Sequence, residues 1–237
     1  MRRRKRLIDE LGRARPEIGD PAAAIEAGVV LVDGSVVTNP RSMVASDASI
    51  VVRERAELRG SVKLRWALDR FGVDPTGKMC LDVGAAAGGF TWVLVGRGAA
   101  RVYAVDVGHG QLLGSLRQDE RVVNLEATNV ADLNPSLVRD ALSLVTVDVS
   151  YLALGDAVAQ LGGLRFAPGA ELIGLVKPMF ELRLATAPTD GASLERATRE
   201  AVDAIGEAGW QVVARAPSVT TGAKGAVEGF VHARRIG

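Results

Sequence analysis

The sequence predicts an α/β fold built on a mainly parallel sheet, and three features support this prediction. Residues 79–106 read as an apolar strand, a glycine-rich turn, a short apolar helix and a second apolar strand that ends in an acid. Strand and helix patterns continue to alternate from there to residue 233, and glycines end several of them. Because alternating units of this kind place helices on both faces of a sheet, they favour a parallel α/β architecture.

The α/β part is expected to begin with a helix over residues 61–72, which carries apolar residues at helical spacing. Strands are predicted over residues 79–83, 102–105, 122–125, 144–147, 172–176, 210–214 and 227–233, and helices over 90–95, 111–118, 158–161 and 193–208. Ligands of such sheets bind at the carboxyl ends of the strands. Asp82, Asp106, Asp148 and Lys177 all fall at such ends, so we expect the functional site there.

Residues 1–55 predict a small separate α+β module, followed by a linker over 56–62 and the α/β domain over 63–237. The pair Asp20-Pro21 predicts a helix start, because aspartate is a good N-cap and proline suits the first helical position. Asp33-Gly34 lies between two apolar runs and predicts a hairpin. A third strand is expected over residues 48–52.

The basic residues are concentrated near the N-terminus. The net charge of the 237 residues is only +1, but residues 1–65 hold 13 Lys and Arg against 9 Asp and Glu. The rest of the chain holds 16 against 19. A basic first third favours contact with phosphate, and a solvated charged end is the alternative.

The composition, at 48% hydrophobic residues, is sufficient for a full core. No apolar run reaches the roughly 18 residues that a membrane span needs, and the N-terminus lacks the apolar centre of a signal peptide. The single cysteine, Cys80, cannot form an internal disulfide, so a cytoplasmic location is expected. The two histidines, His109 and His232, are isolated, and no metal centre is predicted.

The glycine turn, Gly84-x-x-x-Gly88-Gly89, indicates a particular ligand. It is neither the G-x-G-x-x-G of dinucleotide-binding folds nor a phosphate loop, which carries Lys-Ser or Lys-Thr. Glycines let a ligand approach the backbone closely, and Asp106, about 20 residues further on, suits the hydroxyls of a ribose. The pattern favours S-adenosylmethionine, which has no pyrophosphate, while other nucleotide ligands remain an alternative.

Two charges follow apolar strands that would otherwise be buried, namely Asp148 and Lys177. A charge in such a place needs a partner, so we expect these two to pair. The pair is either structural or part of a site in which the lysine acts as a general base. Glu228 interrupts the last apolar run and is either a site residue or an outward-facing position. Lysine is rare in this chain, with five lysines against 24 arginines, and Lys63 is one of them. This rarity favours a specific role for Lys63 over that of an ordinary exposed lysine.

Taken together, these motifs resemble the TlyA family of methyltransferases, whose catalytic domain is FtsJ-like, over nearly the whole chain. The motifs that carry the resemblance are Cys80–Gly84 with Gly88–Thr91, Tyr103–Gly108 with Gln111-Leu112, Leu116-Arg117 with Asp119 and Arg121-Val122, Thr128-Asn129, Asp148–Ser150, and Leu175–Pro178 with Phe180-Glu181. Residues 24–34 also resemble the small RNA-binding domain of a ribosomal small-subunit protein and of pseudouridine synthases.

The resemblance implies a Rossmann-like methyltransferase fold with an antiparallel last strand, and methyl transfer from S-adenosylmethionine to a ribose 2′-hydroxyl of ribosomal RNA. It assigns catalysis to Lys63, Asp148, Lys177 and Glu228. Lys177 would be the general base, Asp148 would orient it, and Glu228 would position Lys63 or the ribose. It assigns cofactor binding to Asp82, Gly84, Ala85, Gly88, Gly89, Phe90, Asp106, Val107, Asn129 and Asp148. Ribosomal RNA or ribosomal subunits would bind through residues 1–15 and the N-terminal module.

The chain departs from the family pattern at several places. Ala86 and Ala87 replace a serine and a threonine, and Trp92 replaces an acid. Residues 182–193 replace a glycine-rich stretch and an acid, Gly225-Ala226 replaces Gly-Asn, and Asp20-Pro21 replaces Ser-Arg. These differences keep open a second hypothesis, a methyltransferase of a small molecule in a biosynthetic pathway. A third hypothesis is a binding protein without catalysis.

Overall fold

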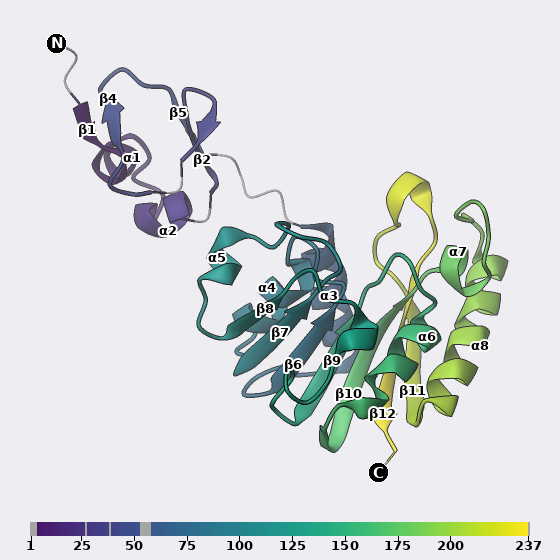
Figure 1. The fold of residues 1–237 in the computed structure, drawn as a ribbon. Helices are drawn as coiled ribbons and strands as arrows, with labels where there is room; N and C mark the ends of the chain where they lie inside the picture. Colours follow the sequence, from purple (N-terminus) through teal and green to yellow (C-terminus); the bar gives the residue numbers. More distant parts are fainter. Residues whose placement is uncertain (1–3, 27, 38, 53–57, 237) are drawn as a thin grey trace. The chain divides into compact units, whose positions relative to one another are not determined.

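The computed structural model describes residues 4–26, 28–37, 39–52 and 58–236. These residues form two compact units, which we describe separately, and the second begins at Leu58. Figure 1 shows the elements of both units along the chain.

The first unit contains short elements and its own small core. They are β1 (Arg4–Arg6), α1 (Leu7–Ala14), α2 (Pro21–Glu26), β2 (Val30–Val32), β3 (Ser35–Val36), β4 (Met43–Ala45) and β5 (Ile50–Val52). The strands form a three-stranded sheet in the order β3-β2-β5 and an antiparallel pair of β1 with β4. The core side chains come from both helices and both sheets: Leu7, Leu11, Ile25, Val30 and Val44.

The local signals of this unit are confirmed. Asp20 Oδ1 accepts a hydrogen bond from Ala23 N at 3.0 Å, as an N-cap does. Asp33 and Gly34 have φ of 50° and 82° and join the paired strands β2 and β3, so the predicted hairpin is present. The pairing of β1 with β4 was not predicted, because strands of three residues carry almost no periodicity.

The second unit is an α/β domain with one seven-stranded sheet. Its elements are α3 (Arg59–Phe71), β6 (Met79–Val83), α4 (Gly89–Gly96), β7 (Arg101–Val105), α5 (Gly114–Arg117), β8 (Val122–Leu125), η1 (Val130–Asp132), β9 (Leu142–Val147), α6 (Leu154–Ala159), η2 (Gln160–Gly163), β10 (Phe166–Val176), α7 (Pro178–Glu181), α8 (Gly191–Glu207), β11 (Trp210–Pro217), η3 (Ala223–Gly225) and β12 (Gly229–Arg235). The strand order is β11-β12-β10-β9-β6-β7-β8, and β12 runs antiparallel to both of its neighbours. The predicted sheet, mostly parallel with an antiparallel last strand, is confirmed.

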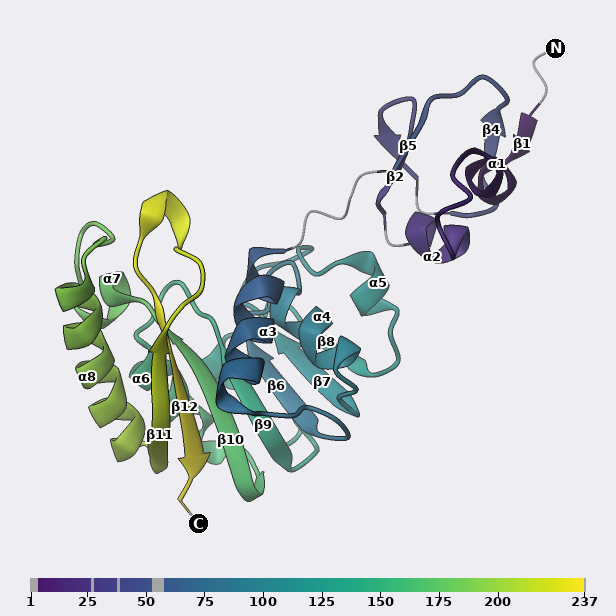
Figure 2. The same cartoon turned by 180° about the vertical axis from the view of Figure 1, so that it is seen from behind.

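Helices cover both faces of this sheet, as the opposite views in Figures 1 and 2 show. Buried side chains of α3 and α4 pack on one face together with Cys80 and Phe230. Those of α6 and α8 pack on the other face with Leu172 and Trp210. Because both faces are covered, the loops at the carboxyl ends of the strands are where a ligand can reach the sheet.

Several element boundaries differ from the prediction. Helix α3 begins at Arg59, so residues 59–62 of the predicted linker lie in a helix, while Arg53–Glu57 lie outside the described residues. The helix predicted over 111–118 is reduced to α5, and the backbone N–H groups of Gln111 and Leu112, which precede it, donate to Glu126 at 2.6 and 3.0 Å. Strand β10 is longer than predicted, since a register irregularity accommodates its Pro and Gly.

None of the helices described in the structure is long and apolar enough to cross a membrane.

Candidate active site

The carboxyl ends of β9 and β10 bring Asp148 and Lys177 together. The two strands are parallel neighbours, so the residues that follow them meet at one edge of the sheet. Lys177 Nζ lies 2.5 Å from Asp148 Oδ1, which confirms the predicted pair. The same amine donates to Val149 O at 3.0 Å and to Ser150 Oγ at 2.8 Å. Two hydrogen bonds and one ion pair to a single loop therefore hold Lys177 Nζ in place.

Lys63 and Glu228 form a second ion pair. Lys63 lies on α3 and Glu228 directly precedes β12, and Lys63 Nζ donates to Glu228 Oε2. The two residues are only 7% and 8% exposed. The alternative readings, an ordinary exposed lysine and an outward-facing glutamate, are therefore wrong. Burying two charges is costly, because both lose their hydration, and their attraction offsets this cost only with good geometry and further hydrogen bonds.

Both pairs border cavities at the carboxyl edge of the sheet. One cavity of about 340 Å³, which we call the lysine cavity, is lined by Lys63, Lys177 and Glu228 together with residues of the loops after β10 and before β12. A smaller cavity of about 200 Å³, the glycine cavity, is lined by residues of the glycine turn and by Asp148. Asp148 touches the glycine cavity and also the amine that faces the lysine cavity. It therefore stands between the two.

The glycine turn requires the absence of side chains at two positions. Gly84 has φ of 89°, and a Cβ on it would lie 2.3 Å from Asp148 O. Gly88 has φ of 94°, and a Cβ there would lie 2.3 Å from Leu116 Cδ1. L-residues with side chains rarely adopt these φ values. The turn thus packs tightly on the loop after β9, and this packing shapes the glycine cavity.

Asp106 links the glycine turn to the loop after β7. Its Oδ2 accepts from Ala86 N at 2.8 Å and its Oδ1 from Gly108 N at 2.6 Å. The next residue, Val107, is 48% exposed although it is apolar. Asn129 is exposed and caps η1 through its side chain. An acid, an exposed apolar side chain and an exposed amide thus follow neighbouring strands, as a site for a nucleoside requires.

The other predicted cofactor residues differ in their accessibility. Ala85, Gly89 and Phe90 line the glycine cavity. Asp82, in contrast, has no exposed surface, and its two oxygens accept from Thr91 Oγ1 at 2.6 Å and Thr146 Oγ1 at 3.0 Å. We therefore assign Asp82 to supporting the turn from beneath, rather than to direct contact with a ligand.

The burial of Asp82 gives a prediction for stability. Burial raises the pKa of Asp82 from 3.8 to about 6, although Thr91 and Thr146 donate to it. The folded state therefore holds this proton more tightly than the unfolded state, and the contribution to stability is lost as the pH rises through about 6. We expect the free energy of unfolding of the native protein, relative to Asp82→Asn, to fall by about 2–3 kcal/mol between about pH 4 and pH 7. Denaturant titrations of both proteins across this pH range measure the difference. Free energies of unfolding that change equally with pH in the two proteins would contradict the prediction.

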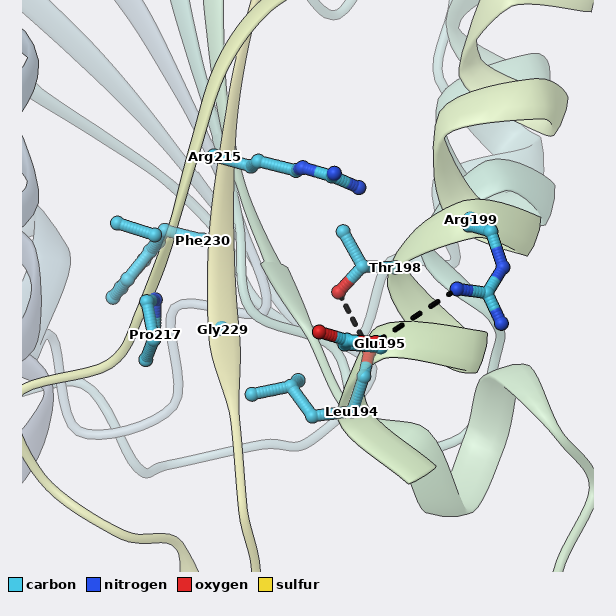
Figure 3. A pocket seen from close by; sticks show the side chains of 9 residues that line it. Leu194, Glu195, Thr198, Arg199, Arg215, Pro217, Gly229 and Phe230 are labelled. Carbon is cyan, nitrogen blue, oxygen red and sulfur yellow. Dashed lines mark hydrogen bonds and ion pairs between the residues drawn. The ribbon is translucent and has the colours of Figure 1, made fainter. Parts of the chain in front are cut away.

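A further cavity, of about 320 Å³, lies between α8 and β11. Figure 3 shows the side chains of Arg199, Arg215, Thr198 and Glu195 around it. It contains none of the predicted site residues.

Two residues near Lys177 were given no role by the sequence analysis. Ser150 contacts Lys177, and Glu181 is buried near the same loop. Both occur in the quoted motifs, which was the one available signal.

Comparisons with known proteins agree with this geometry. A family model described as FtsJ-like methyltransferase matches residues 57–235. The 16S/23S rRNA (cytidine-2'-O)-methyltransferase TlyA of Mycobacterium tuberculosis is 39% identical across 99% of this chain and 91% of that protein. Hemolysin A of Brachyspira hyodysenteriae is 34% identical across 88% of this chain and 90% of its own length. A solved structure from Streptococcus thermophilus that carries a hemolysin name gives a TM-score of 0.72 at 25% identity, covering 100% of this chain and 90% of that one.

Proposed function

The chain belongs to the TlyA family of FtsJ-like methyltransferases, and on this premise we propose that it methylates a ribose 2′-hydroxyl of ribosomal RNA with Lys177 as the general base. The observation that carries the proposal is the assembly of Lys63, Asp148, Lys177 and Glu228 at the carboxyl edge of the sheet, in two ion pairs beside two cavities. A site with separate cavities for donor and acceptor, joined at a pair of charged groups, suits group transfer better than simple binding.

S-adenosylmethionine is the methyl donor, and it supplies an electrophilic methyl group on a sulfonium sulfur. The residues present fit this molecule. The glycine cavity exposes the turn from Gly84 to Gly89, where backbone can approach a ligand closely. Asp106 stands at the end of the next strand, where an acid can accept both hydroxyls of a ribose. We propose Val107 and Asn129 as further contacts, since both are exposed beside that acid.

Lys177 is the group best placed to remove the proton of the acceptor hydroxyl. It lines the lysine cavity, and Asp148, Val149 O and Ser150 Oγ fix its amine. The Ser150 hydroxyl can donate as well as accept. It is thus able to keep its hydrogen bond to Nζ while the amine gives up and regains a proton. Lys63 is held by Glu228 at the wall of the same cavity, where it contributes positive charge and Glu228 can contact the ribose.

We further propose that the first unit contacts RNA phosphates through β1. Arg4 and Arg6 are exposed and, because strand side chains alternate, point to the same side. Lys5 points the other way and pairs with Glu10 at 2.8 Å. Arg13 and Lys5 together hold the pKa of Glu10 at about 2, so these two cations are already engaged. Arg4 and Arg6 therefore remain the stronger candidates among residues 4–15. A ribosomal acceptor also agrees with the cytoplasmic location expected from the sequence.

The function is tested by methyl transfer from labelled S-adenosylmethionine to naked ribosomal RNA, to isolated ribosomal subunits and to small nucleosides. We expect label in RNA, at a nucleotide whose 3′ phosphodiester resists alkali, because alkaline cleavage needs a free 2′-hydroxyl.

The contact of β1 with RNA is tested by the double variant Arg4→Ala/Arg6→Ala. It should raise KM for RNA and reduce the salt dependence of that KM, because each phosphate contact releases counterions. Arg101→Ala, which removes an ion pair to Asp140 on the domain, is the matched control. Transfer to nucleosides alone would favour the small-molecule hypothesis, and label on a base would contradict the proposed chemistry.

A further inference from the structure

Glu181 is a buried carboxyl group at the end of α7, only 9% exposed. Its Oε1 accepts a hydrogen bond from Leu154 N at 2.8 Å. Leu154 is the first residue of α6, and the N-cap of that helix is Ala153, whose side chain has no acceptor. The first N–H groups of a helix need a partner outside the helix. Glu181 supplies this partner from a different element.

The loop between β9 and α6 is consequently held at both ends by the segment around α7. At its start, Asp148, Val149 and Ser150 contact Lys177 Nζ. At its end, Leu154 is held by Glu181. Lys177 and Glu181 are themselves joined, because Glu181 N donates to Lys177 O at 3.2 Å. These contacts form a closed ring, so a displacement at Leu154 is transmitted to the groups around the amine.

The hydrogen bond does not depend on the charge of Glu181. Burial is the main cause that raises its pKa to about 7, and the nearby carboxylates of Asp156 on α6 and Glu200 on α8 act in the same direction. Near neutral pH the group therefore exists in both forms. Either form keeps an oxygen that can accept from Leu154 N, since even a protonated carboxyl retains an acceptor.

We propose that Glu181 is a positioning residue for Lys177. By holding Leu154, it fixes the loop whose Asp148, Val149 and Ser150 set the place of the amine. Its effect on methyl transfer rests on the proposed function, whereas its effect on the Lys177 amine does not. Glu181 is not part of the four-residue catalytic set, and it acts on the acceptor only through Lys177.

The first test measures the amine directly and needs no RNA. Lys177 is labelled with a small amine-reactive reagent over a range of pH, and the label is quantified by mass spectrometry. In Glu181→Ala we expect faster labelling of Lys177, because its loop is released. In Glu181→Gln the rate should match that of the native protein, since the amide oxygen still accepts from Leu154 N. Glu171→Gln is the matched control, because it removes the charge of a half-buried carboxylate in the middle of β10 that pairs with Lys78 and His232.

The second test is kinetic. Glu181→Ala is expected to lower kcat by about tenfold to a hundredfold, with unchanged KM for S-adenosylmethionine and RNA, because misplacement of a catalytic group costs rate rather than binding. The midpoint of its pH–rate profile should move, and Glu181→Gln should restore kcat and the profile. Circular dichroism of each variant reports whether it folds. If Glu181→Ala does not fold, Glu181→Asp takes its place, because its carboxylate is one methylene shorter and falls short of Leu154 N. Lys177 should then be labelled faster in Glu181→Asp than in Glu181→Gln, and equal rates would overturn the proposal.

Three results would overturn the proposal. The first is a rate of Lys177 labelling in folded Glu181→Ala equal to that of the native protein. The second is a change in Glu181→Ala that is confined to KM, and the third is a kcat of Glu181→Gln as low as that of Glu181→Ala. A failure of the proposed function looks different. In that case the native protein transfers no methyl group to RNA, while the labelling of Lys177 still responds to Glu181→Ala.

Discussion

Replacement of Lys177 by alanine is expected to lower kcat for methyl transfer by about 10²–10⁴, the usual contribution of a general base. The affinity for S-adenosylmethionine should stay unchanged, because Lys177 lines the lysine cavity and not the glycine cavity. Stopped assays with labelled donor give the rate, and calorimetric titration of the donor gives the affinity. Lys78→Ala is the control, since Lys78 forms a comparable ion pair with Glu171 away from the cavities.

Lys177→Arg separates two possible roles of this residue. An arginine keeps the positive charge beside Asp148 but cannot lose its proton in a protein. If Lys177 works as a base, the arginine variant should be as inactive as Lys177→Ala. If only its charge matters, Lys177→Arg should keep most of the rate, and that result would contradict the assigned mechanism. Full activity of Lys177→Ala would exclude both roles.

Gly84→Ala is expected to destabilise the protein and to abolish binding of S-adenosylmethionine. A left-handed backbone costs an L-residue about 1–2 kcal/mol. In addition, the new Cβ would lie 2.3 Å from Asp148 O and 2.8 Å from Asp148 C. Those atoms are backbone and cannot swing aside, so overpacking adds about 1–3 kcal/mol. Relief of the clash would move the turn away from the loop after β9, which deforms the glycine cavity and shifts Asp148.

Gly110→Ala is a matched control for this prediction. Gly110 also has a left-handed backbone, with φ of 72°, but a Cβ on it would meet no atom within 4 Å. Gly110→Ala should therefore be destabilised only by the cost of a left-handed backbone, without a clash, and it should still bind S-adenosylmethionine. Denaturant unfolding gives both free energies, and calorimetry gives both affinities. Equal stability of the two variants would show that the contact with Asp148 is unimportant.

Local sequence signals predicted the elements that depend on near neighbours. Strands β6, β7, β8 and β9 were predicted because each predicted run holds at least three apolar residues and at most one polar residue between turn residues. The pairing of Asp148 with Lys177 followed from a simple rule, that charges at the ends of adjacent buried strands must meet a partner. The hairpin at Asp33-Gly34 was likewise predicted by two residues that favour positive φ.

Other features depended on distant parts of the chain and left no local signal. Helix α7 has four residues and no periodicity of its own. The burial of Asp82 was missed, because a residue near a strand end was expected to face the ligand, whereas Thr91 and Thr146 enclose it. Glu181 was one residue of a motif, and only the position of α6 gives it a partner.

The sequence by itself determined the class of the sheet, the glycine turn and the identity of the four charged residues, because these depend on residue type and on spacing along the chain. The tertiary structure decided that Lys63 pairs with Glu228 and which of the predicted site residues stay accessible. Lys63 and Glu228 are 165 positions apart, and the contact between them exists only because α3 and the start of β12 pack against one core. Such contacts are stabilised by the burial of many side chains at once, so no short segment of sequence can specify them.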